Sequence, residues 1–179
     1  MSDLNHTAVV ILGMLASGPK SGYDIKGLVD KSTRFFWSAS YGQIYPELRE
    51  LERAGLVFGE DRAQGGRART SYALTSAGSD ALHDWLASPE ETKHEIRDAG
   101  ILKLFFSDAL APDEQLANLR AMRTRYEGIA SRLRAEIQPF AAEAPGEFPG
   151  RTARFGVELY EWLAGWCARE EEDLRRRGG

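Results

Sequence analysis

Ser38–Val57 has the sequence SASYGQIYPELRELERAGLV, and this stretch decides how the rest of the chain is interpreted. If it is helical, its apolar residues share one face: Ile44, Leu48 and Leu51. The other face then carries Tyr41, Tyr45 and Arg49. Gly55 is a typical helix terminator, and the residues after it begin a strand. An ordinary amphipathic helix would show the same spacing, so the flanking segments must decide between a structural and a functional role.

Two more helices are predicted upstream. The first covers Asn5–Ser17 and ends at Gly18-Pro19, a strong helix breaker. The second covers Ser21–Lys31, with its first residue as N-cap and Asp24 in a capping-box position. Free backbone amides at its start, beside the hydroxyl of Tyr23, are suited to binding a phosphate. Tyr23 could equally pack against the first helix.

The segment before the central helix is apolar. Arg34–Trp37 contains three aromatic rings, and we expect them to fill the gap between the second and third helices as part of the core. Pro46 is tolerated only near a helix start, because further in it removes a hydrogen bond and clashes. The regular helix should therefore begin near Tyr41–Gln43. Its leading end, the part that contacts base edges in helix-turn-helix proteins, would hold Ser40, Tyr41 and Gln43.

Two short strands are expected after the central helix, over Val57–Glu60 and Thr70–Leu74. The sequence DRAQGGRAR between them supplies a tight turn at Gly65-Gly66. It also places three arginines on a short ribbon: Arg62, Arg67 and Arg69. In a plain hairpin these arginines would only be solvated. Beside a reading helix the hairpin would be a wing whose arginines contact phosphates or the minor groove, and we favour this interpretation.

A fourth helix closes the first part of the chain. Thr75 should cap it over Ser76–Ala87, with an inward face of Ala81, Leu82, Trp85 and Leu86. The polar segment SPEETKH that follows marks a boundary, so the expected domains are 1–88 and 89–179. The first of them is expected to be a winged helix-turn-helix domain.

Three helices are expected in the second domain, over Ile96–Leu110, Asp113–Gln138 and Arg151–Arg177. Asp113 should cap the middle helix and Pro139 should end it. Its apolar residues approach a coiled-coil seam: Leu116, Leu119, Met122, Tyr126, Ile129, Leu133 and Ile137. A link over 141–150 precedes the last helix, whose apolar residues share one side: Phe155, Leu159, Trp162, Leu163 and Trp166. The expected fold is mainly α-helical, with a small β-hairpin wing and an antiparallel helical region that dimerises.

The amino-acid composition limits the possible functions of the protein. The 179 residues include 23 basic and 27 acidic ones, for a formal charge of −4 at pH 7. Residues 1–88 hold 9 basic and 10 acidic side chains, so neither domain is basic overall. A DNA reader with this balance must concentrate positive charge locally and should bind random DNA weakly. Cys167 is the single cysteine, which excludes an internal disulfide and fits a reducing compartment. Without a signal peptide or an apolar run of ~18 residues, the expected location is the cytoplasm.

The order of these motifs resembles the PadR family of bacterial transcriptional regulators. The resemblance rests on GPKSGYDI, SASYGQIYPELRELERAGLV, a Gly-Gly-Arg wing and SYALTSAG, each at its expected place. It is strongest over Ala8–Leu86, while the C-terminal helices look like the family's dimerisation region with less distinctive residues. The resemblance implies a winged helix that reads a palindromic DNA operator as a homodimer. It also implies a repressor that, in some members, is relieved by aromatic ligands.

By position, the resemblance implies DNA contacts from three segments. The start of the second helix would hold the DNA backbone through Ser21, Gly22 and Tyr23. The third helix would face the major groove with Ser40, Tyr41, Gln43 and Tyr45, to which we add Arg49. The wing would contribute Arg62, Gly66, Arg67 and Arg69. This chain departs from many such readers in charge, since Glu47, Glu50 and Glu52 lie beside Arg49 and Arg53. Base specificity should therefore depend on hydrogen bonds from Gln43 and the tyrosines.

Other function classes compete with DNA binding. The three histidines are scattered and no carboxylate pair converges, so we expect no catalytic residue, metal or cofactor. A protein-interaction adaptor that binds its partner through the winged domain is the alternative, and the salt dependence of binding would separate the two. A flat or aromatic effector could bind four aromatic residues of the second domain: Phe105, Phe106, Trp162 and Trp166. The core of a dimer interface is the alternative role that we favour for them.

Overall fold

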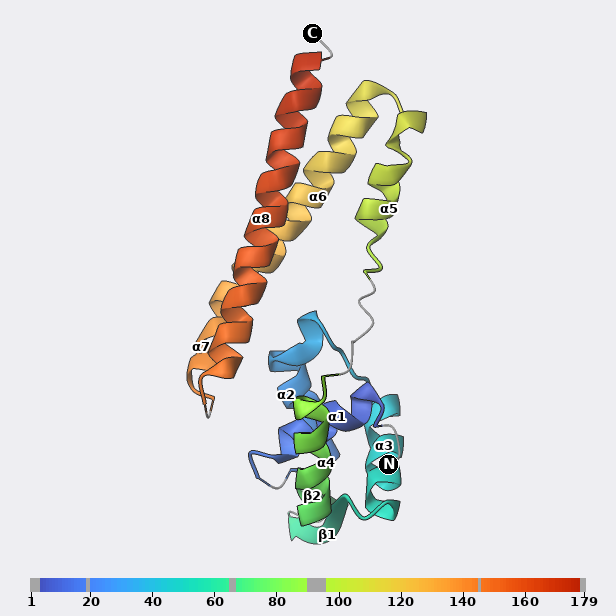
Figure 1. The fold of residues 1–179 in the computed structure, drawn as a ribbon, viewed down its shortest axis with the longest axis vertical. Coiled ribbons are helices and arrows are strands. Elements are labelled where there is room, and N and C mark those ends of the chain that lie inside the picture. Colours follow the sequence, from blue (N-terminus) through green and yellow to red (C-terminus); the bar gives the residue numbers. More distant parts are fainter. Residues whose placement is uncertain (1–3, 19, 65–66, 90–95, 145, 178–179) are drawn as a thin grey trace. The chain divides into compact units, whose positions relative to one another are not determined.

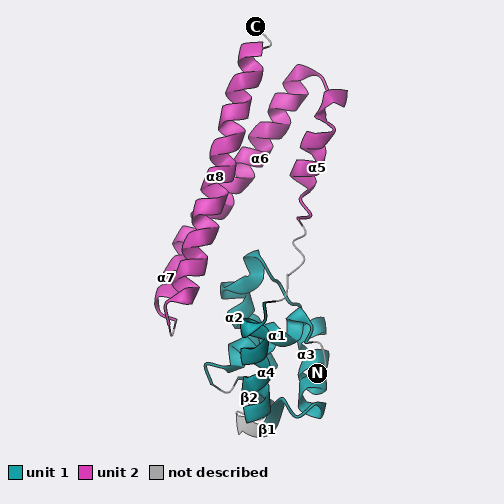
Figure 2. Ribbon diagram, in the orientation of Figure 1, with its two compact units in different colours: residues 1–91 teal, residues 92–179 magenta. Residues whose placement is uncertain are grey.

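The computed structural model describes residues 4–18, 20–64, 67–89, 96–144 and 146–177, with backbone alone for 62–64 and 67–69. The chain divides into two compact units, Met1–Glu91 and Thr92–Gly179 (Figure 2). Each unit is described separately below. Within the described residues, no helix combines the length and the apolar character needed to cross a membrane.

Unit 1 contains four helices and a hairpin within its described residues (Figure 1). The helices are α1 (His6–Leu15), α2 (Gly22–Lys31), α3 (Tyr41–Arg53) and α4 (Ser76–Ala87). A 3₁₀ turn, η1 (Thr33–Phe35), lies between α2 and α3. Strands β1 (Val57–Gln64) and β2 (Arg67–Leu74) pair antiparallel, with Val57 opposite Leu74 and Gln64 opposite Arg67. The strands are therefore longer than predicted, and the Gly65-Gly66 turn lies outside the described residues.

The core of unit 1 joins α1, α2, α3 and the start of β1. The predicted apolar face of α3 is confirmed, because Ile44, Leu48 and Leu51 are all buried. They pack in one cluster with residues of the other elements: Ala8, Ile11, Leu12, Leu15, Ile25, Val29, Ala39 and Val57. At roughly 1.5–3 kcal/mol for each large side chain, this burial dominates the stability of the unit.

Helix boundaries in unit 1 follow the capping signals. Ser21 is the N-cap of α2, where its hydroxyl accepts from the Asp24 backbone amide while the Asp24 carboxylate accepts from the Ser21 backbone N–H. Gly55 follows α3 with a φ of +71°, a conformation that favours glycine at a helix end. Pro46 lies in the second turn of α3, which begins at Tyr41 as predicted.

The start of α4 packs closely against the backbone just before β1. Thr75 caps α4 as predicted, and its hydroxyl also donates to the Gly55 carbonyl at 2.8 Å. Gly78 lies on the carbonyl of Leu56, so near that a Cβ placed there would be 1.9 Å from the oxygen. The SYALTSAG sequence therefore contains the start of a helix and also a glycine, Gly78, that the close packing requires.

Three apolar residues of unit 1 depart from expectation. Phe36 is 63% exposed and Trp37 is 40% exposed, so the prediction that the aromatic connector fills the core is wrong for both. Leu86, expected to face inward, is 67% exposed, whereas Trp85 is half-buried. The core cluster is already closed by aliphatic residues from the helices, which leaves these side chains at the surface.

Unit 2 is helical throughout its described elements. They are α5 (Ala99–Phe105), η2 (Ser107–Ala109), α6 (Pro112–Arg132), the π-helical turn η3 (Leu133–Ile137), α7 (Gln138–Ala142) and α8 (Phe148–Arg177). Helices α6 and α8 run antiparallel and side by side, and α5 packs along α6 (Figure 1). Most of the predicted seam is buried, including Leu119, Met122, Tyr126, Leu133 and Ile137. Leu116 and Ile129 are half-buried.

Five predicted helix boundaries in unit 2 are wrong. The helix expected over Ile96–Leu110 is limited to α5, since Asp98 caps it. Helix α6 begins at Pro112 rather than after a cap at Asp113, because proline fits the first helical position. The chain continues as helix past Pro139, since in η3 the Gln138 N–H donates to the Leu133 carbonyl and places the proline at the start of α7. Helix α8 begins three residues before the expected Arg151.

Helix α8 has two apolar faces rather than one. Its inner face, against α6, is built mostly from small residues: Ala153, Val157, Ala164 and Cys167. The predicted stripe of larger residues divides, because Leu163 and Trp166 pack partly against the buried cluster of Met122 and Tyr126. Phe155, Leu159 and Trp162 remain exposed. The exposed face is the part of the stripe available for another molecule.

Candidate nucleic-acid interface

The start of α2 packs directly against the ring of Tyr45. Gly22 is buried, and a Cβ placed on it would lie 2.6 Å from Cε1 of Tyr45. Ser21 is buried as well, and its hydroxyl donates to Asp24 at 2.7 Å. Ser21 therefore caps α2, Gly22 allows α2 to approach Tyr45 of α3, and the surface beside them is provided by the tyrosines.

Three tyrosine rings form a row across α2 and α3. Tyr23 stacks on Tyr41 with ring centroids 6.3 Å apart, and Tyr41 stacks on Tyr45 at 6.1 Å. All three side chains are exposed, although each has neighbours that restrain it. We call Tyr23, Tyr41 and Tyr45 the tyrosine row. It brings together three of the predicted DNA contacts from two helices.

The arrangement of charges on α3 is more favourable for binding DNA than the number of acidic residues suggests. Arg49 lies one turn after Tyr45, is exposed, and forms no ion pair among the described residues. The acidic residues all have partners. Glu47 accepts from Asn5 at 2.9 Å, Glu50 pairs with Arg53 at 2.7 Å, and Glu52 accepts from the Gly59 backbone at 3.0 Å. Among the residues that the structure describes, the cation nearest the tyrosine row on α3 thus has no ion-pair partner, whereas the carboxylates are engaged.

Ser40 and Gln43 cap the leading end of α3. The Ser40 backbone N–H donates to Oε1 of Gln43 at 2.9 Å, and the Ser40 hydroxyl donates to the same oxygen at 3.0 Å. Both residues are exposed; Ser40 is the N-cap of α3 and Gln43 lies in its first turn. They are therefore at the predicted position, but the Gln43 carbonyl oxygen already has two hydrogen bonds.

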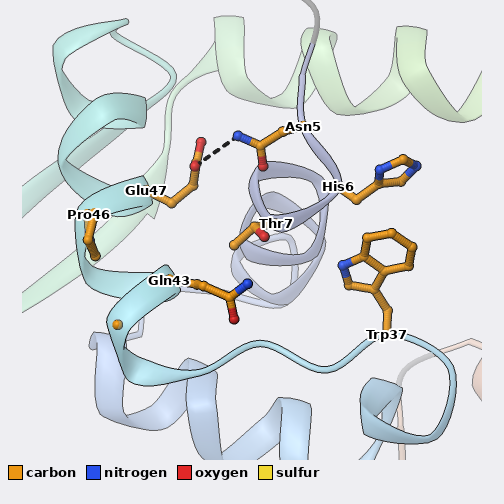
Figure 3. A pocket seen from close by; sticks show the side chains of 8 residues that line it. Asn5, His6, Thr7, Trp37, Gln43, Pro46 and Glu47 are labelled. Carbon is orange, nitrogen blue, oxygen red and sulfur yellow. Dashed lines mark hydrogen bonds between the residues drawn. The ribbon is translucent and has the colours of Figure 1, made fainter.

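An open cavity of about 430 Å³ lies beside this first turn (Figure 3). The start of α1, the connector and α3 line it through Asn5, His6, Thr7, Trp37, Gly42, Gln43, Pro46 and Glu47. The rings of His6 and Trp37 are in contact at a tilt of 33°, with their centroids 4.3 Å apart. Figure 3 shows the Gln43 side chain extending from α3 into this space.

The hairpin is anchored beside α2. Lys20 and Tyr72 exchange two backbone hydrogen bonds of 2.9 Å, so the residue preceding the Ser21 cap extends the sheet. Arg62 is opposite Arg69, and Arg67 begins β2. The side chains of these arginines, and Gly66 entirely, lie outside the described residues. Their assignment to a DNA-binding wing remains a prediction.

Sequence reasoning missed two lysines of this region. Lys26 lies one turn after Tyr23, and its Nζ is 5.7 Å from the ring centroid of Tyr41. It also forms an ion pair with Asp30. Lys20 donates from Nζ to Ser17 and Gly18, and burial lowers its pKa, partly offset by the charge of Asp24. The i, i+3 spacing of Tyr23 and Lys26 was the available signal.

The candidate effector residues lie in unit 2. Phe105 and Phe106 form an edge-to-face pair 5.0 Å apart, and both are exposed. Trp162 is exposed on α8, while Trp166 is half-buried against the Tyr126 cluster. Within the described part of the chain, these four residues do not line a common cavity. Their effector role also remains a prediction.

Cys167 does not have the properties of a reactive thiol. It is fully buried, and burial, followed by the charge of Glu171, raises its pKa. Since the thiolate is the reactive form, this environment favours a packing role. Glu171 is only 2% exposed and is held by Arg123 at 2.7 Å and Arg175 at 3.1 Å.

Comparison with known proteins agrees with this geometry. The sequence profile described as "Transcriptional regulator PadR-like family" matches residues 11–84. The negative transcriptional regulator PadR of Bacillus subtilis (strain 168) is 33% identical over 143 residues, which cover 75% of this chain and 79% of that protein.

Two solved structures have the same fold over nearly the whole chain. Bacillus subtilis PadR in complex with operator DNA superposes with a TM-score of 0.87 and 26% identity, covering 95% of this chain and 99% of that one. The same protein in complex with p-coumaric acid gives a TM-score of 0.79 at 25% identity, with 94% and 98% covered.

Proposed function

Because the chain belongs to the PadR-like family of transcriptional regulators, we propose that it represses transcription by binding operator DNA as a homodimer. The protein is a transcriptional regulator and not an enzyme. Its relative in Bacillus subtilis is a negative regulator, which supports repression. That relative also forms a complex with operator DNA in a fold very similar to this one. The relatives named above give no support to a protein-binding adaptor.

The tyrosine row is the observation that carries the proposed DNA contact. It joins the start of α2 to the outer side of α3, with Arg49 one turn further along α3. Tyrosine hydroxyls donate to phosphate oxygens, and an arginine adds a charge-assisted bond. Helix α3 would lie in the major groove, with α2 against the backbone beside it.

The hairpin would make a second contact with DNA. Its attachment to Lys20 by two backbone hydrogen bonds holds the base of β2 beside the start of α2. Arg62, Arg67 and Arg69 are near the tip in sequence and would reach a phosphate or the minor groove. These contacts would supply most of the positive charge at the interface, because the chain as a whole carries −4.

Unit 2 would provide the dimer contact and respond to the effector. The exposed apolar residues on α5 and α8 are the surface available for a second copy: Ile101, Leu102, Phe105, Phe106, Phe155, Leu159 and Trp162. The relative from Bacillus subtilis binds p-coumaric acid, and we propose a flat aromatic effector here as well. Titration of aromatic acids against tryptophan fluorescence tests this, since Trp162 and Trp166 are at the proposed site. The proposal fails if no aromatic acid alters the fluorescence or the affinity for DNA.

Footprinting on the DNA upstream of the protein's own gene tests the DNA-binding role. A homodimer with two reading helices should protect two half-sites about 10 base pairs apart, centre to centre, or a multiple of that distance. Protection of one such pair at protein concentrations that leave flanking DNA accessible is the expected result. Uniform protection, or none with folded dimeric protein, would contradict a sequence-specific regulator. A protein with this role would act in the cytoplasm, where the operator is.

A further inference from the structure

Gln43 has a fixed orientation before any DNA is bound. Its Oε1 accepts from the Ser40 backbone N–H at 2.9 Å and from the Ser40 hydroxyl at 3.0 Å. The backbone N–H can only donate, so the atom facing it must be the carbonyl oxygen and not the amide nitrogen. The alternative orientation would place two donors against each other. The hydrogen-bond network therefore assigns both ends of this side chain.

The acceptor of Gln43 is fully used by this cap. A carbonyl oxygen has two lone pairs, and the two bonds from Ser40 occupy both. The Nε2 group keeps two N–H donors at the leading end of α3. Gln43 is exposed and extends into an open space rather than into the core (Figure 3). Toward a ligand, it is a donor and not an acceptor.

In the major groove, a glutamine that can only donate prefers different bases from one that can also accept. A glutamine with both functions free pairs with adenine, accepting from N6 and donating to N7. A glutamine that can only donate cannot satisfy N6 of adenine or N4 of cytosine, which are both donors. Guanine presents two acceptors, O6 and N7, on the same edge, whereas thymine presents one. An amide N–H donor therefore suits guanine best, because it meets an acceptor at either O6 or N7 and faces no donor on that edge.

From this chemistry we infer that Gln43 reads a guanine in each operator half-site, while the Ser40 cap keeps it from reading adenine. This rests on the proposed binding of operator DNA through α3. Ser40 is thereby a positioning residue, because it sets which end of Gln43 is presented. The preference should amount to roughly tenfold in affinity at that one base pair.

Gln43→Glu tests the inference without removing the cap. A carboxylate accepts both Ser40 bonds, and Ser-x-x-Glu is itself a capping box, so the melting temperature should stay the same or rise. The free end of the side chain changes from a donor to an acceptor, which suits N4 of cytosine. Selection of bound sequences from a randomised operator pool should show one position per half-site where guanine is replaced by cytosine.

The same experiment controls for the effect of the added negative charge on DNA affinity. Repulsion from phosphates lowers affinity for every sequence alike, so it leaves the ratio between bases unchanged. A chemical control uses wild-type protein and modified operators. Replacing the inferred guanine with 7-deazaguanine, which lacks N7, should weaken binding severalfold. Replacement with inosine, which keeps O6 and N7, should leave binding nearly unchanged.

The outcomes separate this inference from the proposed function. Specific binding with a guanine that changes to cytosine in Gln43→Glu supports both. Specific binding in which the variant keeps every wild-type base preference means that Gln43 is not a reader. An adenine at the position that the variant alters means that the cap opens on DNA, and this also overturns the inference. No enriched sequence for the folded wild-type dimer means that the proposed function itself has failed.

Discussion

Gly22 and Tyr45 show how one glycine can shape the proposed DNA-binding surface. The missing Cβ of Gly22 leaves room for the Tyr45 ring, which then continues the stack through Tyr41 to Tyr23. The sequence placed these tyrosines on the outer faces of two helices. It did not show that the rings form one row, because ring stacking between helices depends on their packing.

Gly22→Ala should therefore reduce DNA binding more than stability. The new methyl group would lie 2.6 Å from Tyr45, but the obstacle is an exposed ring that can move. We expect a loss of about 1 kcal/mol in stability and a roughly tenfold loss of operator affinity. Thermal melting and anisotropy titration measure the two quantities.

Gly27→Ala is the matched control on the same helix. Nothing lies within 4 Å of a Cβ at Gly27, so alanine should stabilise α2 by up to ~1 kcal/mol and leave DNA binding unchanged. Similar DNA affinity for the two variants would show that the position of the Tyr45 ring does not matter for binding.

Asp98 provides a pH-dependent contact in unit 2. Burial acts to raise the pKa of Asp98, but hydrogen bonds from Arg125 and from the Gly100 backbone outweigh it and hold the pKa below its usual value. A lowered folded-state pKa means that the carboxylate stabilises the fold above its unfolded pKa, about 3.9. This contribution is lost as the pH falls through the folded-state value.

Asp98→Asn should destabilise the protein by about 1–2 kcal/mol at pH 7, since it removes the charge that pairs with Arg125, although asparagine can still cap α5. Denaturant unfolding at a series of pH values measures the difference from wild type, which should shrink below about pH 4. Glu136→Gln, at an exposed position of η3, is the control and should change little at any pH. A difference for Asp98→Asn that does not depend on pH would contradict the role of the charge.

At the scale of elements, capping and periodicity predicted most of the fold. The apolar face of α3, the caps at Ser21 and Thr75, and the bounds of α4 are all as expected, because each depends on neighbouring residues alone. Pro139 was misjudged because a π-helical turn changes the hydrogen-bond register just before it. A turn of this kind has no sequence signal comparable to a helix cap or a hydrophobic period.

Exposure was the least predictable property of the elements. Phe36 and Leu86 are apolar and suitably spaced, yet both lie at the surface of unit 1. Periodicity indicates which residues share a face, but it does not say whether anything covers that face. The same limit applies to the candidate site: the sequence predicted Gln43 at the leading end of α3, but not the loss of its acceptor to Ser40.

The junction between α4 and Leu56 is the element contact most sensitive to substitution. In Gly78→Ala, the Cβ would lie 1.9 Å from a backbone oxygen, so α4 must shift from its place. We expect a loss of about 2–4 kcal/mol by chemical denaturation. Gly13→Ala in α1, with nothing within 4 Å of its Cβ, should instead be neutral or stabilising. Equal stability of the two variants would show that α4 is not held at this distance.

At the scale of the molecule, the exposed apolar residues of unit 2 require a partner. Phe155, Leu159 and Trp162 continue along α8 on the side away from its packed inner face. Surfaces of this kind on soluble proteins usually mark interaction sites. A second copy of the chain is the partner expected for a regulator that reads a palindrome.

Trp162→Glu should convert the dimer to a monomer at micromolar concentration. It places a charge at the C-terminal end of the exposed stripe and leaves the inner face of α8 unchanged. Sedimentation measures the mass, and the helical circular dichroism should be retained. Thr124→Glu, at an exposed position of α6, is the control and should remain dimeric. An unchanged dimer in Trp162→Glu would locate the interface elsewhere.

The central claim is that this acidic chain binds a specific DNA sequence through a locally positive surface. Fluorescence anisotropy with DNA from upstream of its own gene, against scrambled competitor at two salt concentrations, tests it most directly. We predict tight binding that resists the competitor and weakens steeply as salt rises, because several phosphates are contacted. Binding that is absent at low salt, or equal for the scrambled sequence, in protein shown to be folded and dimeric would contradict the claim.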